Sequence, residues 1–87
     1  MFARKVAVWQ MNEEGERKPC PLQWIDNFAM RNFTNDAIFD DTLPVTDGRM
    51  EIGNRVPLEK LESRLQDWFQ RKGWLKPWER VVVEELG

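Results

Sequence analysis

The segment from Pro57 to Gly73 constrains the fold most, because its apolar residues follow a helical period along its whole length. Proline suits the first turn of a helix, where its missing N–H costs nothing, and glycine is the typical residue just beyond a helix end. The sequence therefore predicts a helix over about 57–72 with one apolar face. That face consists of Leu58, Leu61, Leu65, Trp68 and Phe69.

Four other segments have the residue types of β-strands. The first has a β-branched and aromatic centre, and the last contains the run Val81–Val83. Asp47-Gly48 is a strong turn signal that joins the middle two as a hairpin, and Pro44 restricts the first arm of this hairpin to a sheet edge. The predicted strands are at about 3–11, 42–46, 49–53 and 79–86.

A second helix is predicted at about 22–32, because apolar residues recur there at steps of three and four after Pro21. Residues 12–21 are polar and contain Gly15 and two prolines, which indicates a loop. Together these segments predict one α+β domain over 1–87, with a small, mostly antiparallel sheet and the helix at 57–72 packed on one face. The final strand is expected to pair beside the first.

The residue types that are missing exclude several chemistries. The chain of 87 residues has no His and a single Cys, which excludes Ser-His-Asp and Cys-His nucleophiles, a structural zinc site and an internal disulfide. Cys20, between two prolines, is interpreted as an incidental loop thiol. The sequence shows neither an apolar run of membrane-spanning length nor a signal peptide, so a cytoplasmic protein without a membrane partner is predicted.

Charge is unevenly distributed along the chain. Residues 26–51 hold six acidic and two basic side chains, whereas residues 55–80 hold seven basic and four acidic ones. The acidic side chains of the first segment have three interpretations: a solvated surface, a surface that faces a basic partner, or Mg²⁺ ligands. Their spacing matches no metal-binding loop, so no cofactor is predicted. The acidic residues singled out are Asp36, Asp40 and Asp41.

The stretch "RKGWLKPWER" places Trp74 and Trp78 among four cations at 71–80. A helix that stops at Gly73 sends the next residue, Trp74, back onto the last turn, here onto Phe69. Trp78 follows Pro77 and is a candidate exposed anchor, because Trp and Arg are enriched among binding hot spots. The candidate partner-binding residues are therefore Arg71, Lys72, Lys76, Trp78, Arg80, Asp36, Asp40 and Asp41.

These features predict a protein-interaction domain that is not an enzyme, such as an accessory or inhibitor protein of the kind frequent in phages and mobile elements. The alternative is a nucleic-acid-binding protein that holds single strands on the stretch 71–80. Residues 43–65 also resemble the wing and following helix of small winged-helix DNA-binding proteins, which implies DNA contacts by Arg49 and Arg55. The acidic segment 34–41, where such proteins place a recognition helix, departs from that pattern. A homodimer formed through a free strand edge or an exposed Trp is a further alternative.

Overall fold

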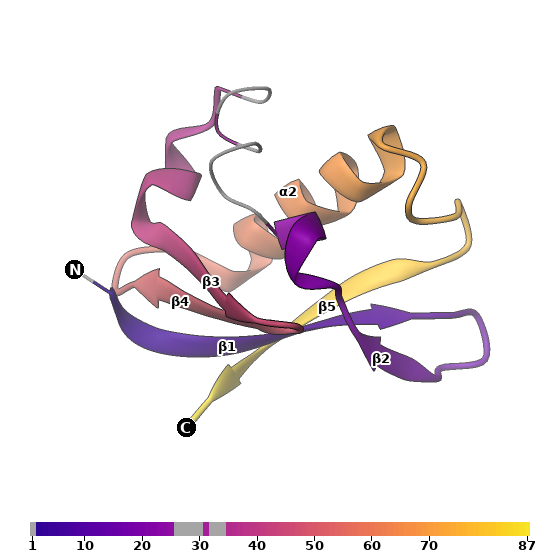
Figure 1. Cartoon of the computed structure of the whole chain (residues 1–87), viewed down its shortest axis with the longest axis horizontal. Helices are drawn as coiled ribbons and strands as arrows, with labels where there is room; N and C mark the ends of the chain where they lie inside the picture. The colour runs from indigo at the N-terminus through magenta and orange to yellow at the C-terminus, as the bar shows by residue number, and fades with distance from the viewer. Residues whose placement is uncertain (1, 26–30, 32–34) are drawn as a thin grey trace.

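The computed structural model describes residues 2–25, 31 and 35–87, and here the predicted strands join one antiparallel sheet (Figure 1). The helix α2 crosses one face of this sheet, as predicted. The elements in chain order are β1 Phe2–Met11, β2 Arg17–Pro19, η1 Leu22–Ile25, η2 Ala37–Asp41, β3 Thr42–Thr46, β4 Arg49–Gly53, α2 Leu58–Arg71 and β5 Arg80–Leu86.

β1 is the central strand. On one side it pairs with β5 from Lys5 to Met11, which confirms that the last strand lies beside the first. On its other side it pairs first with β4 and then, from Trp9 to Met11, with the short β2. β3 completes the sheet on the outer side of β4.

The turn at Asp47-Gly48 lies against the sheet at the point where β4 and β2 meet. Gly48 accepts a hydrogen bond from the Val8 N–H at 2.8 Å and donates its own N–H to the Cys20 carbonyl at 2.7 Å. Its φ is +71°, and a Cβ there would lie 2.6 Å from the Cβ of Pro19. The Asp47 carboxylate also accepts the Leu22 N–H at 2.7 Å. The hairpin therefore does not project as the resemblance to a DNA-binding wing implies.

The apolar face of α2 supplies the largest part of the core. Leu61, Leu65 and Phe69 are fully buried, and Leu58 packs against the cluster from the helix start. Burial of each large apolar side chain contributes about 1.5–3 kcal/mol before the entropy cost of folding. The sheet residues buried under this helix are Val6, Val8, Met50, Ile52, Val81 and Val83.

The helix ends as the sequence predicts. Gly73 adopts a φ of +78°, its N–H bonds to the Gln70 carbonyl at 3.1 Å, and the Trp74 N–H bonds to the Phe69 carbonyl at 3.0 Å. This pair of bonds is the Schellman motif, which satisfies carbonyls that the last turn leaves without partners. Trp74 consequently turns back and stacks on Trp24 with ring centroids 5.4 Å apart.

Three parts of the sequence-based prediction need correction. The predicted loop 12–21 contains the strand β2, because residues 17–19 pair with β1. Of the helix predicted at about 22–32, Leu22–Ile25 form a 3₁₀ helix and Arg31 is α-helical, whereas residues 26–30 and 32 lie outside the described part of the chain. Cys20 is not a loop thiol but a core residue with 0% exposure, because its backbone joins β1 and the hairpin turn.

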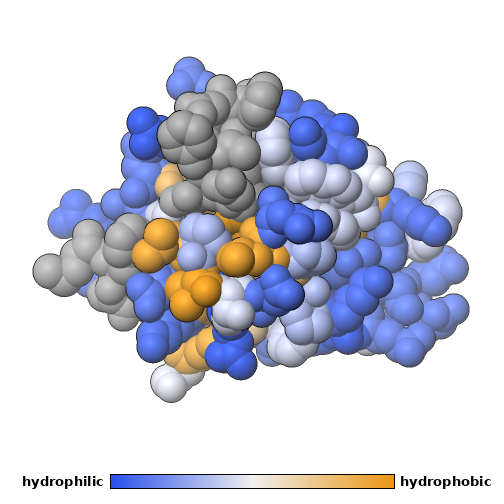
Figure 2. All heavy atoms as spheres, viewed as in Figure 1, coloured by the Kyte–Doolittle hydropathy of each residue, from blue (hydrophilic) through white to orange (hydrophobic). Residues whose placement is uncertain are grey.

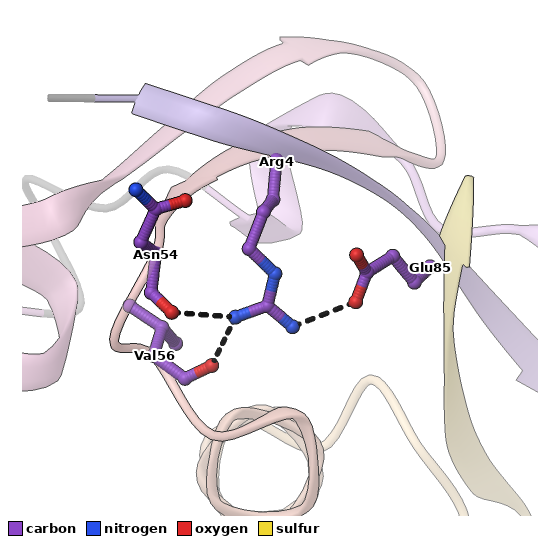
Figure 3. A network of polar contacts seen from close by, with 4 residues as sticks. All are labelled: Arg4, Asn54, Val56 and Glu85. Atoms are coloured by element: carbon purple, nitrogen blue, oxygen red, sulfur yellow. Dashed lines mark hydrogen bonds and ion pairs between the residues drawn. The ribbon is translucent and has the colours of Figure 1, made fainter. Parts of the chain in front are cut away.

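Arg4 connects three distant segments of the chain (Figure 3). Its guanidinium donates to the backbone carbonyls of Asn54 and Val56 at 3.2 and 2.8 Å and to the Glu85 carboxylate at 2.7 Å. The hydrogen bond from Arg4 lowers the pKa of Glu85. This network ties the start of β1 to the connection that precedes α2 and to the end of β5.

The outer edge of β5 is capped by side chains of α2. The Val81 N–H donates to Gln66 Oε1 at 3.3 Å, and the Val83 N–H donates to Glu62 Oε2 at 2.8 Å. Gln66 and Glu62 lie one helical turn apart, and their side chains reach successive outward N–H groups of β5. The edge is therefore partly closed to the addition of another strand.

The edge formed by β3 carries Pro44. Along each strand, the backbone N–H groups point alternately to the two sides of the strand. The Val8 N–H points to the β4 side of β1, and following this alternation through the pairing of β1 with β4 and of β4 with β3 places the Pro44 nitrogen on the outer side of β3. Proline has no N–H to donate, so this edge is also poorly suited to strand pairing. A homodimer formed by strand pairing, one of the predicted alternatives, is opposed by these features at the β5 and β3 edges.

Candidate functional site

Trp78 is displayed on a tight turn between α2 and β5. The Glu79 N–H bonds to the Lys76 carbonyl at 2.9 Å, and the Glu79 carboxylate accepts the Lys76 N–H at 3.0 Å. The second carboxylate oxygen of Glu79 accepts the amide of the buried Gln10 at 3.4 Å, which connects the turn to β1. Pro77 suits the first central position of such a turn. Trp78, at the second, is 56% exposed, the largest value among the described large hydrophobic residues.

A hollow of ≈ 460 Å³ lies beside this ring. Lys76 places its ammonium 5.5 Å from the centroid of the Trp78 ring. Glu13 and Arg80 form no ion pair with any described residue, so both charges are available to a ligand. The lining residues are Met11, Asn12, Glu13, Gly15, Gln66, Pro77, Trp78, Glu79 and Arg80.

The predicted basic surface at 71–80 is divided into two parts. Arg71 forms an ion pair with Asp67 at 2.7 Å on α2. Lys72 lies over Trp68 and Trp74, with its ammonium 5.3 and 5.5 Å from the ring centroids. These two cations are thus engaged at the helix end, whereas Lys76 and Arg80 lie beside Trp78.

The predicted acidic surface is largely neutralised within the chain. Asp36 caps η2 by accepting the Ile38 N–H at 3.1 Å, and it forms an ion pair with Arg64 of α2. Asp40 forms an ion pair with Arg31 at 3.2 Å. Asp41 is exposed and forms no ion pair within the described residues.

One predicted acid and one predicted base meet in a polar hollow of ≈ 400 Å³. Asp36, which caps the start of η2, and Arg71 of α2 both line this hollow. Charges of both signs alternate around it, so it favours neither an anion nor a cation. The remaining lining residues are Asn35, Ala37, Arg64 and Asp67.

Exposed apolar residues around β3 were missed by the sequence-based prediction. Leu43 and Val45 are 43% and 52% exposed, and Leu22 on the adjacent η1 is 40% exposed. Figure 2 shows hydrophobic atoms gathered over β3 on a side of the molecule that is otherwise mainly hydrophilic. The sequence signal that could have located these exposed residues is Pro44. Proline favours an edge strand, and an edge strand leaves part of its side chains uncovered.

Cys20 and the described carboxylates are the candidates for a reactive or metal-binding centre. Burial raises the pKa of the Cys20 thiol from 9.0 to about 12, so the thiol is protonated and inert at neutral pH. Among the residues that the structure describes, no three Cys, Asp or Glu side chains form a group that could hold a metal ion.

The described helices are also too short or too polar to cross a membrane. No protein-family model, no curated protein and no solved structure matches this chain.

Proposed function

We propose that this domain is a non-catalytic protein-interaction module that occupies the surface of a partner protein, with Trp78 as its anchor. The observation that carries the proposal is the exposure of Trp78 on a turn closed by two hydrogen bonds between Lys76 and Glu79. In cellular terms it would act as an accessory or inhibitor protein of the cytoplasm, where a single reduced thiol such as Cys20 is usual.

The rigidity of the turn supports binding. A side chain that is already ordered in the free protein loses little conformational entropy when a partner covers it. Pro77 and the Glu79 contacts to Lys76 and Gln10 restrict the backbone on both sides of Trp78. Around the ring, polar groups such as Asn12 resemble the rim that surrounds an interface hot spot.

The charges near Trp78 favour a protein over a nucleic acid. Glu13 and Glu79 line the same hollow as the ring, and carboxylates repel phosphate. Arg71 and Lys72, which the nucleic-acid alternative requires, are engaged with Asp67 and with the rings at the helix end.

The test compares the parent chain with Trp78→Ala and with a control, Lys60→Ala, whose side chain is exposed on α2. Immobilised chains capture proteins from native host lysate, and each captured protein is then purified and titrated by calorimetry. We expect Trp78→Ala to weaken binding about tenfold or more, a loss of about 1.4 kcal/mol, and Lys60→Ala to leave it unchanged.

Captured proteins that bind equally well to Trp78→Ala would contradict the anchor. A parallel titration with labelled single- and double-stranded oligonucleotides examines the alternative. Salt-dependent binding of an oligonucleotide that is lost in Trp78→Ala would replace the proposed protein partner with a nucleic acid.

A further inference from the structure

No described helix packs on the face of the sheet opposite α2. The described helices contribute their buried residues, such as Ile25, Phe39 and Leu65, to the core on the other face. Figure 1 shows α2 on one side of the sheet, with no described helix on the other. Strand residues alternate between faces, so this opposite face is defined by β1 residues Lys5, Ala7, Trp9 and Met11 and by their neighbours. We call this surface the open face.

One end of the open face contains an apolar hollow of ≈ 160 Å³. Val45, which is 52% exposed, and the half-buried Leu86 supply apolar wall on two strands that lie on opposite sides of β1. The hollow is smaller than the roughly 300–1,000 Å³ of pockets that enclose drug-sized ligands, so it suits a single inserted side chain. The remaining lining residues are Lys5, Thr46, Arg49, Met50 and Glu51.

Unpaired cations border this hollow. Lys5 and Arg49 lie diagonally across β1 and β4, both are exposed, and neither forms an ion pair with a described residue. Elsewhere on the same face, Arg17 is neutralised by Glu84 at 2.6 Å. Among the described residues that line the hollow, Glu51 is the one carboxylate against two cations, so the lining carries a local positive charge on a chain whose net charge is −2.

We propose that the open face docks an acidic, apolar peptide segment of a partner protein. An apolar side chain of the segment fills the hollow between Val45 and Leu86, and its carboxylates pair with Lys5 and Arg49. Such a segment lies across the face, because the caps on β5 and Pro44 on β3 oppose its addition as an extra strand.

The charge argues against a second copy of this chain as the occupant. A two-fold contact centred on the hollow brings the same patch of each copy together, so two hollows with the same net positive charge would face each other. Like charges that face each other across an interface oppose that pairing. A segment rich in carboxylates has the opposite charge.

The test uses synthetic octapeptides in which one Leu or Phe is flanked by Glu residues. Two matched sets serve as controls: in one Lys replaces every Glu, and in the other Ser replaces the apolar residue. Amide shifts of the ¹⁵N-labelled full chain locate each peptide, and fluorescence anisotropy gives its affinity. We expect the acidic, apolar peptides alone to shift the amides of Lys5, Val45, Arg49 and Leu86.

The variant Lys5→Glu/Arg49→Glu should weaken this binding at least about tenfold. The matched control is Arg55→Glu/Lys60→Glu, which makes the same charge change at exposed positions without described ion pairs and should have less than a twofold effect. Thermal melting followed by circular dichroism checks that both variants fold. Trp78→Ala should leave peptide binding unchanged, so this site and the Trp78 anchor fail independently.

Four results would overturn the proposal. In the first, no acidic peptide shifts these amides; in the second, the Lys-containing peptides bind equally well. In the third, a single-stranded oligonucleotide shifts the same amides more strongly than any peptide, which would assign the open face to a nucleic acid. Concentration-dependent dimerisation that Arg49→Glu abolishes would instead assign it to a second copy.

Discussion

Trp74 and Trp78 belong to one short connection, yet their environments differ completely. Trp74 stacks on Trp24 and lies edge-on to Trp68 with centroids 6.4 Å apart, as part of the packed core. Trp78 is 56% exposed and contacts the ammonium of Lys76. Identical side chains therefore serve packing in one position and display in the other.

The difference arises from two backbone motifs. The left-handed Gly73 returns the chain toward α2 and carries Trp74 with it. The turn closed by Lys76 and Glu79 then directs Trp78 outward. Side-chain type alone does not decide whether a Trp in this connection is packed or exposed. The backbone conformation of the preceding residues decides it.

The largest expected effect lies on the packed side. Leu65 has 0% exposure in the core that also holds Trp74. We expect Leu65→Asp to abolish cooperative unfolding, because it removes about 1.5–3 kcal/mol of burial and adds several kcal/mol for an unpaired buried carboxylate. Thermal melting followed by circular dichroism measures this, with Ser63→Asp on the exposed side of the same helix as the control. A melting curve like that of the parent would show that the assigned helix face is wrong.

The direct comparison is Trp74→Ala against Trp78→Ala. We expect Trp74→Ala to lower the free energy of unfolding by about 2–4 kcal/mol, somewhat less than a fully buried Trp, because its ring is only partly buried. Trp78→Ala should change it by less than about 0.5 kcal/mol. Urea titrations monitored by circular dichroism give both values. Equal losses would remove the distinction between the packed and the displayed ring.

Alkaline pH offers a third way to examine the packed side. The folded Cys20 thiol has a pKa of about 12 against 9.0 for the ordinary thiol, so above pH 9 the unfolded chain releases this proton more readily. This group therefore leaves stability almost unchanged well below pH 9 and lowers it as the pH rises from 9 toward 12.

The measurement is the change in unfolding free energy between pH 8 and pH 10 in the parent and in Cys20→Ala. Other groups titrate in this range too, so only the difference between the two chains reports on the thiol. We expect the parent to lose more stability than the variant. An identical loss in both would mean that the thiol is accessible to water.

The smallest expected loss of stability concerns Gly73, whose backbone turns Trp74 back toward α2. Gly73→Ala should cost about 1 kcal/mol, because alanine is strained at a φ of +78°. Nothing lies within 4 Å of the added Cβ, so the loss comes from the backbone alone. Urea titration measures it, and Gln70→Ala at an exposed helix position is the control. An unchanged stability would indicate that Trp74 packs without the left-handed turn.

Much of the fold could be predicted because its signals are local. The period of Leu61, Leu65 and Phe69 defined the helix face, and Gly73 defined its end. Asp47-Gly48 located the hairpin, whose two strands match the predicted 42–46 and 49–53. Each signal depends on residues within a few positions of one another.

The candidate site was predictable only in part. The exposure of Trp78 followed from Pro77 and the end of α2, but its neighbours Met11 and Glu13 come from a distant segment. The engagement of Asp36 by Arg64 likewise joins elements that are far apart in sequence. Charge counted along the chain therefore overstated the separation of positive and negative surfaces.

The sequence by itself determined the helix α2 and the strands β1, β3, β4 and β5, because backbone preferences and apolar periodicity act between near neighbours. The tertiary structure alone decided that Cys20 is buried, that α2 caps the edge of β5, and that Lys5 and Arg49 border an apolar hollow. These features require strands to pair in one particular register. That register is selected by the packing of the whole sheet against α2, which no single segment encodes.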